Sequence, residues 1–213
     1  FIVKTLLEMG VSVESDLTVN IKNNTLIDEV ISFLSFIDSP DDDLSFAGFL
    51  SGKIFQKKTG FNRNAIINWI TQQRIDTQSG YLYPAFKRDF PDIWEQYFDY
   101  FFKNSGYLPI YDFVVLFLKK WAVLNNFIED SAYFLHMCEL IKTQETVQQN
   151  NLTSFLEFWN NDQEKEEPFQ LKSTAGANAI KVMTIHKAKG LQFPVAILPF
   201  LKLNTFGSSD SKD

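Results

Sequence analysis

A short segment near the end of the chain gathers side chains that can bind phosphate. Residues 180–199 read IKVMTIHKAKGLQFPVAILP, in which Thr184 supplies a hydroxyl group, His186 an imidazole, and Lys187 and Lys189 ammonium groups. The apolar runs on either side predict a strand, a tight polar turn over residues 184–190, and a second strand. Placed at the edge of a sheet, these polar groups are of the kinds that contact phosphates. A buried hairpin with a basic turn is the alternative.

The order of these residues resembles a known helicase motif. The run from Thr184 to Gln192, followed by Phe-Pro, is similar to motif V of superfamily 1 DNA helicases of the UvrD, RecB and AddA kind. The resemblance implies that Thr184 and His186 contact the phosphates of single-stranded DNA. Lys187 and Lys189 would supply local positive charge.

The same resemblance implies a nucleotide-binding role for Gly190 and Gln192. Gly190 lacks a Cβ, so its backbone could pass close to a nucleotide or to a neighbouring turn. The family usually has Glu at the position of Gln192, where it contacts the ribose of ATP; an amide can still bond to a hydroxyl group but carries no charge. ATP and Mg²⁺ would be cofactors of the complete helicase, and we expect this chain alone to bind neither.

The composition limits where nucleic acid could bind. The chain has 213 residues, 45% of them hydrophobic and 22 of them Phe, which is enough for a globular protein with a good core. Its net charge of −6 argues against a surface that binds polyanions everywhere, so any DNA contact must be local. A single cysteine, Cys138, indicates a reducing, cytoplasmic setting. The most apolar segment, residues 113–118, is too short to cross a membrane.

Most of the chain has the apolar spacing of helices. Residues 1–10 read as a helix, and residues 11–14 as a short strand. Apolar residues then recur at helical spacing in seven segments: 26–37, 44–50, 64–72, 93–102, 110–124, 131–148 and 153–160. The first of these should end before Pro40, and Pro109 suits the first turn of the fifth.

The predicted fold is mainly α, and α+β overall. A helical body is inserted in a small β-containing platform that the two chain ends form. In the helicases that the chain resembles, such an insertion is subdomain 2B, which lies between motifs IV and V of subdomain 2A. We therefore assign residues 1–23 to subdomain 2A, residues 24–170 to a 2B-like helical body, and residues 171–213 to a return segment of 2A with motif V. The chain would be a piece of a larger protein.

Several other features invite a functional interpretation that the residues do not favour. Gly48 to Ile54 has three residues between its glycines where a phosphate-binding loop needs four, and no Ser or Thr follows Lys53. The run Asp41–Asp43 could bind a cation, but Asp43 is better placed to cap the next helix. His136, on an apolar helical face, reads as a hydrogen-bonded, semi-buried residue.

Two further clusters could contact nucleic acid. The aromatic and basic residues of segment 81–90 could stack on bases, although packing of a loop against the helical body is the favoured role. Lys53, Lys57, Lys58 and Arg63 form the densest basic cluster, which could touch duplex DNA or could simply be solvated. No arrangement of metal ligands, and no nucleophile with its base, is apparent.

Together these residues favour one function over another. The resemblance implies the accessory (2B) and motif V region of an ATP-dependent DNA helicase or helicase–nuclease that translocates on and unwinds DNA in recombinational repair. The chain itself would hold no catalytic residues. Its partners would be single-stranded DNA at motif V and the rest of the motor. Duplex DNA at the helical body and a nuclease domain or partner stay open. The alternative is a stand-alone helical protein-interaction module with no DNA role.

Overall fold

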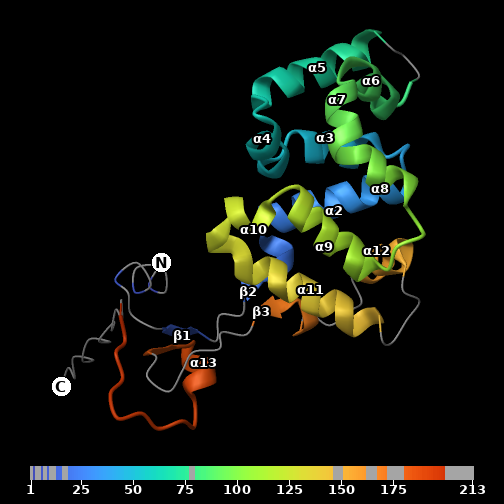
Figure 1. Ribbon diagram of the computed structural model, residues 1–213. Helices are drawn as coiled ribbons and strands as arrows, with labels where there is room; N and C mark the ends of the chain where they lie inside the picture. Colours follow the sequence, from blue (N-terminus) through green and yellow to red (C-terminus); the bar gives the residue numbers. More distant parts are fainter. Residues whose placement is uncertain are drawn as a thin grey trace, which may run out of the picture. The chain divides into compact units, whose positions relative to one another are not determined.

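A computed structural model describes residues 13–15, 19–76, 80–145, 151–161, 167–171 and 180–199, together with Ile2, Leu6 and Met9. The chain divides into two compact units (Figure 1). Residues 18–174 form a helical unit, and residues 1–17 with 175–213 form a smaller one. The described helices include none that is long and apolar enough to span a membrane.

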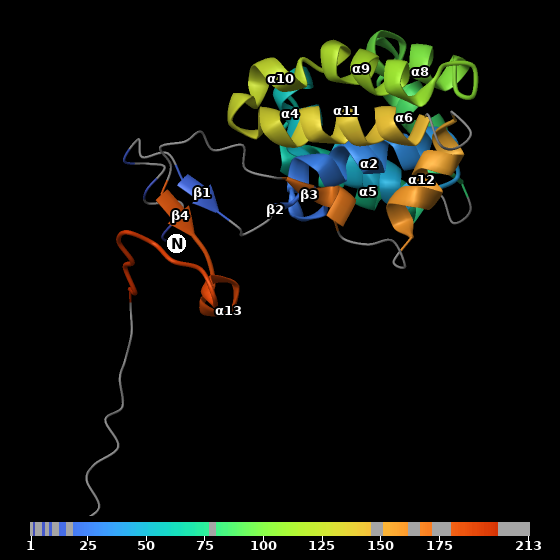
Figure 2. The same cartoon turned by 90° about the horizontal axis from the view of Figure 1, so that it is seen from below.

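The helical unit is an assembly of short helices that confirms a mainly α fold (Figures 1 and 2). Its elements are η1 (Ile21–Asn23), α2 (Thr25–Asp38), α3 (Asp43–Leu50), α4 (Lys53–Thr59), α5 (Arg63–Asp76), α6 (Leu82–Asp89), α7 (Pro91–Ile93), the π-helical turn η2 (Trp94–Phe98), α8 (Asp99–Lys103), α9 (Ile110–Lys120), α10 (Val123–Asn126), η3 (Ile128–Asp130), α11 (Ser131–Glu145), α12 (Leu152–Asn160) and η4 (Glu167–Phe169). Helix α2 ends before Pro40, as predicted.

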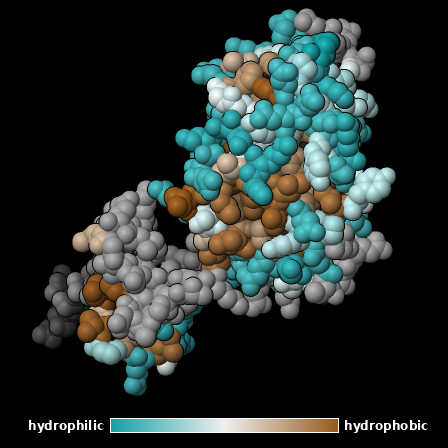
Figure 3. Space-filling view, in the orientation of Figure 1, coloured by the Kyte–Doolittle hydropathy of each residue, from teal (hydrophilic) through white to brown (hydrophobic). Residues whose placement is uncertain are grey.

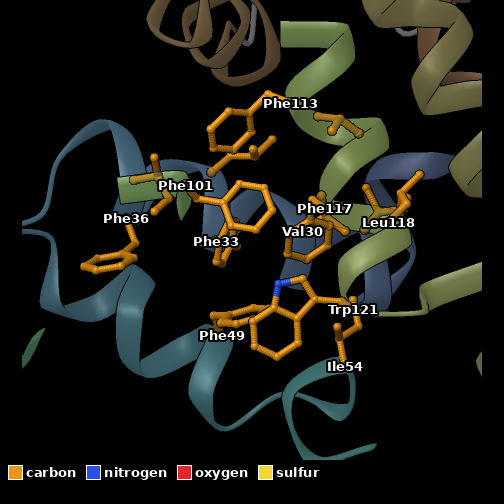
Figure 4. Close-up of a cluster of buried hydrophobic side chains, with 14 of the residues drawn as sticks. Val30, Phe33, Phe36, Phe49, Ile54, Phe101, Phe113, Phe117, Leu118 and Trp121 are labelled. Carbon is orange, nitrogen blue, oxygen red and sulfur yellow. The ribbon is translucent and has the colours of Figure 1, made fainter. Parts of the chain in front are cut away.

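The core of the helical unit is built from aromatic rings around α2. Phe33 of α2 is fully buried and lies 4.9 Å from Phe49 and 4.6 Å from Phe117, measured between ring centroids (Figure 4). The Trp121 indole packs edge-on against Phe49 at 4.9 Å. Aromatic pairs at these separations favour tilted and edge-to-face arrangements, which add to the stabilisation from burial. Many of the 22 Phe residues therefore serve packing.

The single helix predicted over residues 110–124 is wrong, because the chain breaks at Ala122. Helix α9 ends at Lys120, and Ala122 adopts a left-handed conformation with φ 52°. Trp121 and Val123 are both fully buried. Residues two apart on one helix point to different sides. The break at Ala122 allows both side chains to enter the core.

The loop predicted over segment 81–90 is wrong, because this segment forms helix α6. Leu82 and Phe86, four residues apart, are buried on one face, and the stabilisation from this burial outweighs the weak helical signal. Pro84 lies in the first turn, where a missing N–H costs no hydrogen bond. Helix α4, between Gly52 and Gly60, is a further element that the apolar spacing does not predict.

The helical unit joins its own entry and exit. Strand β2 (Val19–Asn20) pairs antiparallel with β3 (Gln170–Leu171). The Lys22 ammonium lies 4.0 Å from the centroid of the Phe169 ring. His136 Nε2 is 2.9 Å from the Pro168 carbonyl oxygen and is only part-buried, which confirms its semi-buried, hydrogen-bonded role.

The two chain ends meet in the smaller unit. Strand β1 (Val13–Ser15) pairs in parallel with β4 (Ile180–Val182), with Val13 opposite Ile180. Parallel strands need a crossover connection. Here that connection is the whole helical unit, so the predicted insertion in a β-containing platform is confirmed. Of the helix predicted over residues 1–10, only Ile2, Leu6 and Met9 are described, the first two as helical; the rest lies outside the described residues.

The second strand predicted after the polar turn is wrong. Residues 191–199 form no strand, and all of them are exposed. The polar turn itself contains one helical turn, α13 (Ile185–Ala188). A strand is stabilised by pairing with a neighbour, and the described residues place none beside this segment.

Candidate nucleic-acid interface

The predicted phosphate-binding residues lie just beyond the end of β4. Val182 ends the strand, and Thr184 begins an arch that runs through α13 to Gly190. In open sheets with parallel strands, ligands bind outside the carboxyl ends of the strands. The arch therefore occupies the end of the β1–β4 pair at which a ligand is expected.

Thr184 is the N-cap of α13. Its side-chain oxygen accepts a hydrogen bond from the Lys187 backbone N–H at 3.4 Å, and the side chain is exposed. A hydroxyl group that accepts through one lone pair can still donate its own hydrogen. Thr184 can therefore order the arch and donate to a phosphate oxygen at the same time.

The three cationic or ionisable side chains of the arch are presented to solvent. His186 and Lys187 belong to α13, Lys189 follows it as the C-cap, and all three are exposed. They lie within four residues of one another, so the arch concentrates positive charge in a chain of net charge −6. This concentration fits a local rather than a global polyanion contact.

Gly190 is required by backbone conformation. Its φ is 86°, in the left-handed region that side chains rarely adopt, and the Leu191 N–H bonds to the Ala188 carbonyl oxygen at 3.0 Å. An added Cβ would meet no described atom within 4 Å. Gly190 thus lets the chain turn after α13, and its role toward a nucleotide stays a prediction. Gln192 is exposed in the following segment, and its ribose contact is likewise untested.

Apolar side chains are unusually exposed around this arch. Ile185 is 68% exposed, and the segment after Gly190 adds others with exposures from 39% to 81%. These others are Leu191, Phe193, Val195, Ile197 and Leu198. Contiguous apolar exposure marks interaction surfaces. The arch is therefore flanked by a surface suited to contact with more protein.

The segment from Gly48 to Ile54 does not form a phosphate-binding loop. The Glu29 carboxylate, from α2, accepts hydrogen bonds from the backbone N–H groups of Lys53 at 2.8 Å and Ile54 at 2.7 Å. The Gly52 N–H bonds to the Phe49 carbonyl oxygen. An internal carboxylate therefore holds the amides that a phosphate would need.

The acidic run Asp41–Asp43 has a structural role, with one correction. Asp42, rather than Asp43, is the N-cap of α3 and accepts a hydrogen bond from the Ser45 N–H at 3.0 Å. Asp43 instead pairs with Arg74 and accepts from the Leu82 N–H at 2.7 Å, which ties α5 and α6 to α3. The described part of the chain holds no group of three or more His, Cys, Asp or Glu that could bind a metal ion.

The aromatic residues of segment 81–90 pack inward. Phe86 is fully buried, and Tyr83 stacks on Trp94 with ring centroids 6.0 Å apart. Arg88 pairs with Asp89. Only Tyr81 among these aromatic rings is exposed by more than half. The packing role is therefore confirmed, although the element is a helix.

Comparison with known proteins gives these features a context. Residues 119–213 match the UvrD-like helicase C-terminal domain. The chain is 32% identical over 110 residues to the RecB component of the RecBCD enzyme of Buchnera aphidicola subsp. Schizaphis graminum, a stretch that covers 46% of the chain and 9% of that protein.

Longer but weaker similarity reaches almost the whole chain. Identity is 23% over 210 residues to the AddA-type component of the ATP-dependent helicase/nuclease of Thermoanaerobacter sp., and 22% over 207 residues to that of Clostridium perfringens. These stretches cover 91% and 89% of the chain, but only 16% of either relative.

The parallel strand pair, the arch beyond it and these matches define a superfamily 1 helicase-like protein. The chain belongs with the UvrD/RecB/AddA-like helicases. It spans less than a fifth of the length of the curated relatives that it matches.

Proposed function

We propose that the chain is the accessory (2B) and motif V region of an ATP-dependent DNA helicase or helicase–nuclease that unwinds DNA in recombinational repair in the cytoplasm. The arch from Thr184 to Gly190 beyond a parallel strand, in a chain with a helicase-type match, carries this proposal. Residues 1–23 and 171–213 would belong to subdomain 2A, and residues 24–170 to subdomain 2B.

The arch would hold single-stranded DNA by its phosphates. The Thr184 hydroxyl group donates to one phosphate oxygen while its oxygen stays bonded to the Lys187 N–H. The exposed His186 imidazole reaches a neighbouring phosphate, and the Lys187 and Lys189 ammonium groups add attraction that depends on salt. Because these contacts are to phosphate, the arch binds without reading sequence.

The described residues do not form a nucleotide site of their own. The Lys53 and Ile54 amides are bonded to Glu29, and no described acidic cluster could hold Mg²⁺. ATP and Mg²⁺ would therefore be held by the remainder of the helicase, with Gln192 near the ribose. ATP supplies the free energy for translocation, and the arch transmits it through its grip on DNA.

Three variants of the complete helicase test this proposal. Thr184→Val removes the hydroxyl group, and because Thr184 caps α13 it also loosens the arch. Thr184→Ser keeps both the cap and the donor, and is the matched control. His186→Ala removes only the imidazole. We expect Thr184→Val and His186→Ala to lower DNA-stimulated ATP hydrolysis and single-strand affinity about tenfold or more, as for a lost bond to a charged group.

The melting temperature separates a lost contact from a lost fold. The arch is exposed, so none of the three variants should change the unfolding of the helical unit. Wild-type turnover and wild-type DNA affinity in both Thr184→Val and His186→Ala would refute the proposal.

The helical unit also offers a surface for the alternative function, a protein-interaction module. Apolar side chains gather on the side of the body that carries α9 and α11 (Figure 3), where Val115 is 40% exposed and Leu135 61%. On this alternative the arch has no DNA role. It predicts wild-type DNA affinity for the Thr184→Val and His186→Ala variants.

A further inference from the structure

Positive charge is concentrated in one stretch of the helical unit. Between Asp43 and Asp76 the sequence holds five cations and no carboxylate, although the whole chain has 26 acidic and 20 basic residues. A surface that needs only to be soluble intersperses both signs of charge. This stretch excludes one sign, which indicates attraction of an anionic partner.

The cations lie on α4 and at the start of α5. Lys53 and Lys57 are exposed and four residues apart, so they share one side of α4. Arg63 is exposed at the start of α5. The two helices are joined through Gly60, whose φ of 79° turns the chain between them. They occupy one end of the body (Figure 1), where the surface is mostly hydrophilic (Figure 3).

Carboxylates of the body leave most of this charge unneutralised. Within the described ranges, no carboxylate forms an ion pair with Lys57, Lys58 or Arg63, whereas Arg74 is paired with Asp43. The Lys58 ammonium lies 5.8 Å from the centroid of the Tyr97 ring. Lys57 and Lys58 also suit the negative end of the α4 dipole. That role explains neither Arg63 nor the lack of acidic residues.

The uncharged residues of the stretch indicate which polyanion fits. Proteins that bind single strands stack bases on exposed aromatic rings. Here Phe55 is fully buried, Phe61 packs edge-on against Phe90, and Trp69 is half-buried and donates to Asp89 Oδ2 at 2.9 Å. The exposed neutral side chains are instead amides and a hydroxyl group. They are Asn62, Asn64, Asn68 and Thr71. Such groups bond to a phosphate backbone and leave the bases stacked.

We propose that the α4–α5 face, formed by Lys53, Lys57, Lys58 and Arg63, binds the phosphate backbone of duplex DNA without reading its sequence. The inference rests on the proposed function only in taking DNA as the polyanion. Three or four phosphate contacts give weak binding whose logarithm falls with the logarithm of salt concentration at a slope of about −3.

The test compares two pairs of substitutions in the full chain. Lys57→Gln with Arg63→Gln removes two cations from the α4–α5 face. Lys119→Gln with Lys120→Gln removes two from the last turn of α9 and changes the net charge equally. Fluorescence anisotropy would measure affinity for a duplex of about 20 base pairs across about 25 to 200 mM KCl. We expect the first pair to reduce the salt slope by about 2 and the low-salt affinity at least about tenfold. The control pair should change neither by as much.

Three outcomes would overturn the inference. These are equal losses in the two pairs, no duplex binding by the wild type at low salt, and tighter binding of a single strand of equal length that the first pair abolishes. His186→Ala, measured in parallel on single-stranded DNA, tests the arch. Loss of one activity without the other therefore shows which proposal has failed.

Discussion

Substituting Gly52 by Ala should destabilise the helical unit even though Ala fits the backbone there. Gly52 precedes α4 with φ −80° and ψ 166°, an extended conformation that any residue adopts. A Cβ at this position would lie 2.5 Å from the carboxyl carbon and from Oε2 of Glu29. Cβ atoms do not approach other atoms so closely, so the Glu29 carboxylate must move away from the start of α4.

The cost follows from the two hydrogen bonds that Glu29 would lose. It caps α4 through the Lys53 N–H at 2.8 Å and the Ile54 N–H at 2.7 Å. Such a cap contributes about 1 kcal/mol for each bond. Burial raises the pKa of Glu29 and so offsets part of this stabilisation. We expect a net loss of about 1 to 2 kcal/mol, or a fall in Tm of about 3 to 6 °C for a domain of this size.

A double-mutant cycle isolates the interaction. Glu29→Ala alone should cost a similar amount, because it leaves the same two amides uncapped. In that background Gly52→Ala should cost only a few tenths of a kcal/mol, since the added Cβ no longer meets a carboxylate. Urea denaturation followed by tryptophan fluorescence measures all four proteins. An equal cost of Gly52→Ala in both backgrounds would refute the reasoning.

Three other results are expected. The Arg88 and Trp69 side chains hold the pKa of Asp89 below its ordinary 3.8, so the stability from this carboxylate is present above that pH and is lost as pH falls through the lowered pKa. Acid titration of urea stability should therefore show a steeper loss in the wild type than in Asp89→Asn. Burial raises the pKa of Cys138 from 9.0 to about 11, so iodoacetamide at about pH 8 should modify the native thiol about 100-fold more slowly than the urea-unfolded one. Equal rates would contradict this burial. The purified chain should show no DNA-stimulated ATP hydrolysis above a buffer blank, and turnover that survives repurification would contradict its assignment as an accessory region.

Features that depend on neighbouring residues could be predicted from the sequence alone. The run from Thr184 to Gln192 carries the helicase resemblance because its residue types and order are local. Helix α2 is predictable because its apolar residues recur at helical spacing, with Pro40 beyond its end. The acid-free stretch between Asp43 and Asp76 is likewise visible in the sequence. It becomes a face only because α4 and α5 expose its cations.

Features that depend on distant residues were decided by tertiary structure. The strand expected after Gly190 does not form, because pairing needs a neighbour that a local pattern cannot supply. Ala122 breaks a continuous helical pattern so that Trp121 and Val123 both reach the core. Helix α4 is capped by Glu29, a residue 24 positions earlier in the chain. In each case a long-range contact outweighs a local preference, because burial and pairing contribute more free energy than intrinsic propensity.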